Sequence, residues 1–139
     1  MQVKLFVIWL VVLLSLVNPL GGNDIKSAQS QPLSFIVTTT AYSYGEPNNS
    51  TATGKHVSTK YIALSRDLLK IIPYGAKVRV TCGKDIIEAE VQDKMGFDPK
   101  TKKPWTMRVD RFMTTKKQCK IWGIKKNCKL EKLDKEKVK

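Results

Sequence analysis

The stretch Lys77-Val-Arg-Val-Thr-Cys-Gly-Lys-Asp-Ile-Ile-Glu-Ala-Glu-Val-Gln-Asp93 predicts a β-hairpin in the middle of the 139-residue chain. Polar and apolar residues alternate along 77–82 and again along 87–93, which is the pattern of half-buried strands. Gly83-Lys-Asp85 supplies the turn between them. Working outward, the Val, Ile, Thr and aromatic residues of three more segments predict strands at 34–42, 61–64 and 105–112.

Two short helices are predicted beside these strands. Ser65 is expected to cap a helix that runs through Leu69, because a serine oxygen accepts an unpaired backbone N–H. Thr115-Lys-Lys-Gln118 is a capping-box pattern that opens a second helix, which Gly123 ends. About six short strands with tight turns and short helices indicate an all-β protein, a small six-stranded closed β-barrel.

The first residues have the pattern of a secretory signal. Residues 5–17 are almost wholly apolar, follow Lys4 and precede a segment with Pro and Gly. This apolar run is short for a membrane span, which needs about 20 residues, although an uncleaved anchor stays open as an alternative. The predicted organisation is a signal peptide at 1–22, a linker at 23–33, a barrel at 34–126 and a basic tail at 127–139, in a secreted or periplasmic protein.

The chain is strongly basic, with 25 Lys and Arg against 12 Asp and Glu and a net charge of +13. Such a field attracts polyanions in general. In an exported protein it favours anionic wall polymers as partners over nucleic acid, and a membrane only if the signal is uncleaved. A polyanion-binding function of the lysine-rich segment 129–139 is an alternative hypothesis.

The three cysteines and the single histidine, His56, lack the spacing of a zinc site. We therefore expect neither a metal nor another cofactor. Cys82 alternates with Val78 and Val80, which predicts a buried thiol in the core. Cys119 and Cys128 could close a short loop in an oxidising compartment, although spacing does not determine the pairing.

Three segments, 61–69, 91–93 and 107–110, bring carboxyl or hydroxyl groups to the edges of apolar stretches. Alternation places Asp93 on the face of Val91 at a strand end, where desolvation favours the protonated acid. Asp110 ends a similar strand, and two neighbouring carboxyls can keep one of them protonated. Glycoside cleavage needs such an acid beside the leaving oxygen. The alternative is that both aspartates simply accept turn hydrogen bonds.

Four more residues are candidates for substrate contact. Ser65 has no Ser/His/Asp setting and is expected to cap the helix rather than act as a nucleophile. Asp67 falls in the first helical turn, where a negative charge is favourable. The rings of Tyr42 and Trp105 could stack on sugars, or equally could be ordinary barrel packing.

Six short motifs follow one another along the chain: Thr40-Ala-Tyr42, Ile62-Ala-Leu-Ser65, Pro73-Tyr-Gly75, Val91-Gln-Asp93, Val109-Asp110 and Trp122-Gly123. Their order is that of the three-aspartate domain, which the chain resembles over 37–124. That domain is a double-psi β-barrel found in membrane-bound lytic transglycosylase A, within a wider group that includes rare-lipoprotein-A transglycosylases and expansins.

The resemblance implies a peptidoglycan lytic transglycosylase with Asp110 as the single catalytic acid and Asp93 in the same groove. The acid would protonate the oxygen between N-acetylmuramic acid and N-acetylglucosamine, and the muramoyl 6-hydroxyl would form a 1,6-anhydro product without a metal. Two features depart from the family: Ser65 stands where the first aspartate is usual, and Asp93-Lys-Met-Gly96 replaces Asp-Thr-Gly-Gly, before an inserted basic loop with Trp105. These departures leave open a non-catalytic, expansin-like barrel that binds wall glycans.

Overall fold

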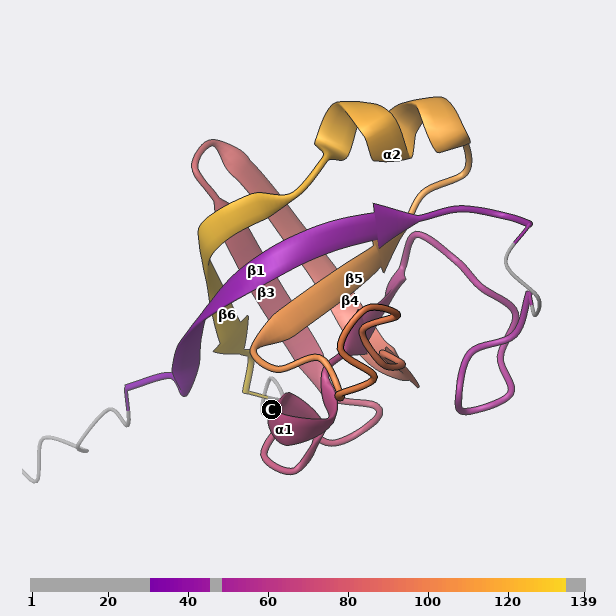
Figure 1. The fold of residues 1–139 in the computed structure, drawn as a ribbon. Helices are drawn as coiled ribbons and strands as arrows, with labels where there is room; N and C mark the ends of the chain where they lie inside the picture. Colours follow the sequence, from indigo (N-terminus) through magenta and orange to yellow (C-terminus); the bar gives the residue numbers. More distant parts are fainter. Residues whose placement is uncertain (1–30, 46–48, 135–139) are drawn as a thin grey trace, which may run out of the picture. The chain divides into compact units, whose positions relative to one another are not determined.

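Six strands close into a barrel in a computed structural model that describes residues 31–45 and 49–134 (Figure 1). The strands follow one another around the barrel in the order β1-β5-β2-β4-β3-β6. The predicted signal peptide and most of the predicted linker lie outside the described residues. The elements are β1 (Ser34–Tyr42), β2 (Tyr61–Leu64), α1 (Arg66–Leu69), β3 (Lys77–Cys82), β4 (Asp85–Lys94), β5 (Arg108–Phe112), α2 (Lys116–Trp122) and β6 (Lys125–Lys132).

The barrel mixes parallel and antiparallel neighbours, and it confirms the predicted small six-stranded all-β fold. β1 pairs with β5 and β2 pairs with β4 in parallel, whereas the other neighbours are antiparallel. Three predicted strands have the observed bounds, and β4 is longer than predicted. β5 begins at Arg108 rather than at Trp105, because a bridge between Phe97 and Pro104 closes the preceding loop on itself.

The predicted end of the barrel at residue 126 was wrong, because β6 runs from Lys125 to Lys132. This strand pairs with β1 on one side and with β3 on the other, so it closes the barrel. Cys128 and Leu130 point into the core while Lys129 between them stays exposed. The basic segment therefore has the alternation of a half-buried strand, although its lysines made it look like a solvated tail.

The disulfide also differs from the suggested Cys119–Cys128 pair. Cys82 is bonded to Cys128, with a sequence separation of 46 residues, and Cys119 is a free thiol. Cys82 is buried as expected, but it is not a thiol. The pairing follows from topology: Cys82 ends β3, which runs antiparallel to β6, so Cys128 lies directly across from it with the Cα atoms 4.5 Å apart.

The interior is filled by every second residue of the strands, and Trp122 of α2 packs with them in the core cluster. The second predicted helix is confirmed, with reciprocal hydrogen bonds between Thr115 and Gln118 and with Gly123 at a φ of 63° after its last residue. Among the described residues no helix is both long and apolar enough to cross a bilayer. The largest fully buried side chains include Phe112, Ile62, Leu64, Leu68, Ile72 and Leu130.

Candidate active site

Four neighbouring strands bring Thr40, Asp110, Ala63 and Asp93 into one row, which we call the aspartate row. Asp110 pairs with Thr40 on one side and with Ala63 on the other, and Ala63 also pairs with Asp93. Directly paired residues carry their side chains on the same face of a sheet. The two aspartates thus flank one small residue, with Cα atoms about 10 Å apart because strands are roughly 4.8 Å apart. Both carboxyl side chains are partly exposed, so neither is sealed in the core.

A break in register at Gln92 turns Asp93 toward this row. Ile62 pairs with Val91, but the next residue of β2, Ala63, pairs with Asp93, so Gln92 is an additional residue. Val91 lies in the core cluster with Ile62, whereas Asp93 lies beside Ala63 on the opposite face. The prediction that Asp93 shares the apolar face of Val91 was wrong, because one extra residue reverses the alternation.

The hydroxyl of Tyr42 lies beside the two aspartates. It donates a hydrogen bond of 3.4 Å to Oδ2 of Asp93, and the hydroxyl of Thr40 donates to Oδ1 of Asp110 at 2.8 Å. Burial raises the pKa of Tyr42, and the charges of Asp93 and Asp110 raise it further. The phenol therefore stays protonated at any physiological pH and acts as a donor to this cluster.

Asp93 also anchors the loop that follows β1. Its Oδ1 accepts the backbone N–H groups of Ala52 and Lys94, each at 2.8 Å. Next to it, the Thr53 hydroxyl donates to Oε1 of the buried Gln92 at 2.6 Å, which fixes the same loop to β4. These contacts agree with the alternative in which Asp93 accepts hydrogen bonds from the backbone of a neighbouring loop.

Ser65 and Asp67 hold the backbone that leads into β5. The sequence suggested that Ser65 caps α1, but the buried Ser65 makes no side-chain cap hydrogen bond to this helix. Its Oγ instead accepts the N–H of Arg108 at 3.1 Å. Oδ2 of Asp67 accepts the N–H of Met107, which has a φ of 48°, at 2.8 Å. The start of α1 lies against β5. The Ser65 oxygen that could accept an unpaired N–H of the helix therefore accepts an N–H of the neighbouring strand.

The carboxylate of Asp67 has a lowered pKa. Burial alone would raise this pKa, but hydrogen bonds from Ser65 and from the backbone of Met107 and Leu68 together outweigh burial. Asp67 is therefore charged at neutral pH and tied to the backbone three residues before Asp110. Both Ser65 and Asp67 thus position the strand that carries Asp110.

Two exposed tyrosines lie close to the row and were not selected from the sequence. Tyr44 packs edge-on against Phe112 with ring centroids 4.7 Å apart, and Phe112 also contacts Tyr42. Burial raises the pKa of Tyr74, the charge of Asp93 adds to this rise, and Arg66 opposes it, which places Tyr74 near both groups. The Pro73-Tyr-Gly75 motif was the only sequence signal for Tyr74.

Two arginines of the neighbouring segments stack on aromatic rings. The guanidinium of Arg66 lies 4.9 Å from the ring centroid of Phe97, and that of Arg108 lies 3.9 Å from the ring centroid of Trp105. Trp105 therefore has one face covered by Arg108. No group of three or more His, Cys, Asp or Glu in residues 31–45 and 49–134 is placed to hold a metal ion.

Comparison with solved structures finds neighbours of this barrel. Neither the family models nor the curated proteins contain a match to the sequence. A solved structure of a Clavibacter michiganensis expansin, an Asp-to-Asn mutant in complex with cellohexaose, is similar with a TM-score of 0.51 and 15% identity. The similarity covers 73% of this chain but 51% of the expansin chain, so the chain spans about half of that protein. It places the fold in the broad double-psi barrel group.

Proposed function

We propose that the protein is an exported lytic transglycosylase that binds a peptidoglycan glycan strand along the aspartate row. The observation that carries this proposal is the pairing of Asp110 and Asp93 on either side of Ala63, with the Tyr42 hydroxyl beside them. The small Ala63 side chain leaves the two carboxyls as the projecting groups of this row. The resemblance to the three-aspartate domain supports the same two residues.

The contacts of the two carboxyls favour Asp110 as the acid. Asp93 accepts two backbone N–H groups and the Tyr42 hydroxyl, so its carboxyl already holds the loop after β1 in place. The Thr40 hydroxyl fixes the orientation of Asp110 on the same face, and the Ser65 and Asp67 contacts fix its strand.

The proposed reaction uses one carboxyl twice. Asp110 first gives its proton to the oxygen that links N-acetylmuramic acid to N-acetylglucosamine, and the bond from that oxygen to the muramoyl anomeric carbon breaks. The 6-hydroxyl oxygen of the same muramoyl unit then bonds to the anomeric carbon, and its proton passes to the Asp110 carboxylate. The products are a 1,6-anhydromuramoyl end and a new N-acetylglucosamine end, and Asp110 is protonated again.

The surroundings of the row suit a chain of sugars. Tyr44 and Tyr74 are each more than 40% exposed, and they lie near Phe112 and Asp93 respectively. Such rings stack on the apolar faces of sugars. The structural neighbour in complex with cellohexaose supports a β-linked glycan as the class of ligand.

Replacing Asp110 by Asn tests the assignment. We expect Asp110→Asn to lower the release of anhydro-muropeptides from purified sacculi by roughly 10²–10⁴-fold, the usual effect of losing a general acid. Asp134→Asn is the matched control, because Asp134 is exposed beyond β6 and should keep full activity. Equal product release by wild type and Asp110→Asn would remove Asp110 from the mechanism.

A second candidate is a non-catalytic barrel that binds wall glycans. The similarity to an expansin solved in complex with cellohexaose favours this candidate. This candidate predicts that the protein sediments with sacculi but releases no soluble muropeptide from them. Any anhydro-sugar in the soluble fraction, absent from the Asp110→Asn reaction, would exclude it.

A further inference from the structure

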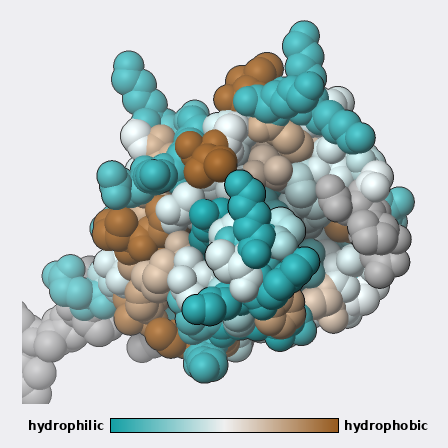
Figure 2. All heavy atoms as spheres, viewed as in Figure 1, coloured by the Kyte–Doolittle hydropathy of each residue, from teal (hydrophilic) through white to brown (hydrophobic). Residues whose placement is uncertain are grey.

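A basic and apolar surface covers the end of the barrel that carries α2 and the β3–β4 turn (Figure 1). We call residues 84–86 and 116–126 the α2 surface. Figure 2 shows hydrophilic side chains that project beside hydrophobic atoms over the α2 end of the molecule, at the top of the view. Three isoleucines in this surface are mostly exposed: Ile121 at 76%, Ile124 at 66% and Ile86 at 64%.

The same segments are rich in lysine. The α2 surface contains six lysines and one acid, Asp85, which gives it a net charge of +5. Nζ of Lys125 lies 2.6 Å from Oδ2 of Asp85, and this ion pair holds the β3–β4 turn against the start of β6. The lysines are Lys84, Lys116, Lys117, Lys120, Lys125 and Lys126, and all but Lys125 are exposed.

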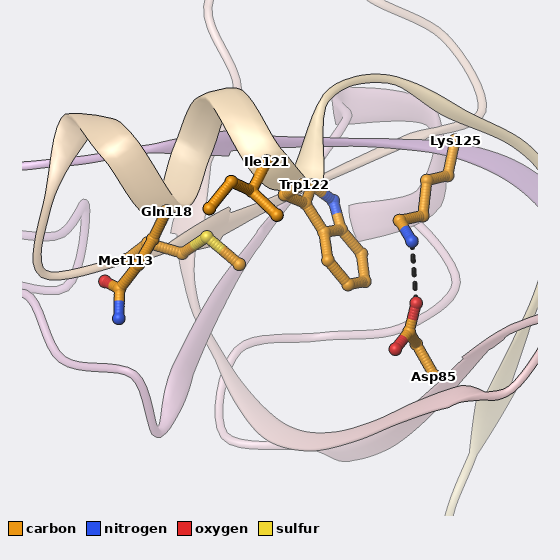
Figure 3. Close-up of a pocket in the computed structure, with 6 residues that line it drawn as sticks. All are labelled: Asp85, Met113, Gln118, Ile121, Trp122 and Lys125. Atoms are coloured by element: carbon orange, nitrogen blue, oxygen red, sulfur yellow. Dashed lines mark hydrogen bonds and ion pairs between the residues drawn. The ribbon is translucent and has the colours of Figure 1, made fainter.

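A hollow of about 220 Å³ lies within this surface (Figure 3). Ile121, Met113 and Trp122 form its apolar wall, and the Lys125–Asp85 pair lies on its other side. The ammonium of Lys125 is 4.4 Å from the centroid of the Trp122 ring. The apolar side chains of Met113 and Trp122 thus line a recess that Lys125 borders.

We propose that the α2 surface docks the protein on a bilayer that contains anionic lipid. Lysine side chains meet phosphate groups at the headgroup level, and exposed aliphatic side chains enter the boundary with the acyl chains. A soluble polyanion would satisfy the lysines alone and gives no reason for three isoleucines that are about two-thirds exposed. The combination therefore favours a lipid surface over an anionic polymer. This inference is independent of the proposed reaction.

The free thiol of Cys119 gives a local probe, because it lies on α2 and the other two cysteines are bonded to each other. The full-length protein is labelled at Cys119 with a polarity-sensitive nitrobenzoxadiazole dye and titrated with vesicles. Vesicles of phosphatidylcholine with phosphatidylglycerol should shift the emission to the blue, and vesicles of phosphatidylcholine alone should shift it much less. Added salt should weaken the binding, because the lysines act through screened charges.

Two variants separate the contributions of charge and apolar contact. Lys116→Gln/Lys117→Gln/Lys120→Gln should bind on the order of 100-fold more weakly, since each lysine near an anionic surface contributes about fivefold. Ile121→Ser/Ile124→Ser should bind at least roughly tenfold more weakly, because the variant loses the apolar contact. Circular dichroism and the unfolding midpoint check that these exposed substitutions leave the barrel intact.

The matched controls are Lys100→Gln/Lys102→Gln/Lys103→Gln in the loop before β5 and Ile71→Ser near α1. Both should bind as the unchanged protein does, and the N-terminal apolar segment is common to every variant. The proposal is overturned if the dye does not respond to anionic vesicles, or if the loop-lysine control loses as much binding as the α2 variant. It is also overturned if Ile121→Ser/Ile124→Ser binds anionic vesicles as the unchanged protein does and soluble polyphosphate shifts the dye emission as much as these vesicles do. That result would assign the surface to polyanionic polymers.

Discussion

At the scale of single residues, Tyr42 connects the barrel packing to the candidate chemistry. Its ring packs on Phe112, and its hydroxyl donates to Asp93 within the charge field of Asp110. The sequence identified Tyr42 only as a ring that could stack or pack. The polar role of its hydroxyl depends on β1 lying next to β5, which no local pattern in the sequence specifies.

Tyr42→Phe removes this donor and keeps the ring. We expect the variant to be less stable by about 1 kcal/mol, the usual net contribution of one hydrogen bond, and to cut sacculi more slowly. Urea unfolding measures the first effect and muropeptide release measures the second. If both quantities equal those of the wild type, the hydroxyl has no role at this site.

Asp67 makes stability depend on pH in a defined direction. The pKa of Asp67 is lower in the folded protein than its ordinary value of 3.8, so its stabilising contribution is complete above that value. The contribution is lost as the pH falls below 3.8 through the folded pKa, because the protonated carboxyl accepts the Met107 N–H more weakly.

Asp67→Asn should therefore be less stable by roughly 1 kcal/mol at neutral pH and should lose less stability than wild type in acid. The measurement is the urea midpoint at a series of pH values from neutral to about 2.5, with Asp134→Asn as the control. A variant whose midpoint falls in acid as steeply as that of wild type would show that Asp67 does not carry this dependence.

At the scale of elements, β6 and the break in β4 show where sequence patterns were insufficient. In β6 two apolar residues, Cys128 and Leu130, alternate with charged ones, and the high lysine content obscured that signal. In β4 the additional residue Gln92 reverses the face of Asp93. A bulge is set by the partner strand, here β2, so alternation within β4 alone could not locate it.

The disulfide between β3 and β6 should stabilise the barrel strongly. A bond that closes a loop of this length contributes about 4 kcal/mol in the chain-entropy model, so Cys82→Ser/Cys128→Ser should unfold at much lower urea concentration. Cys119→Ser is the control and should unfold as wild type does, because its thiol is free. Peptide mapping without reduction should recover Cys82 linked to Cys128; recovery of Cys119 linked to Cys128 would contradict the structure.

At the scale of the whole molecule, the barrel class could be predicted because alternation and turns recur along the chain. Strands 34–42, 61–64 and 77–82 were located correctly from composition and alternation. The aspartate row could not be derived this way, because it joins residues 40, 63, 93 and 110 through two parallel pairings and one antiparallel pairing between distant segments. The strand-end positions of Asp93 and Asp110 made them candidates, the family resemblance supported both, and the topology shows them flanking Ala63.

The most direct test of the account is the mass of the product that the protein releases from purified sacculi. Lytic cleavage with Asp110 as the acid predicts muropeptides that end in 1,6-anhydromuramic acid, lighter by one water than hydrolytic products, from wild type and not from Asp110→Asn. Products that carry the added water, or anhydro products made equally well by Asp110→Asn, would contradict the proposed function.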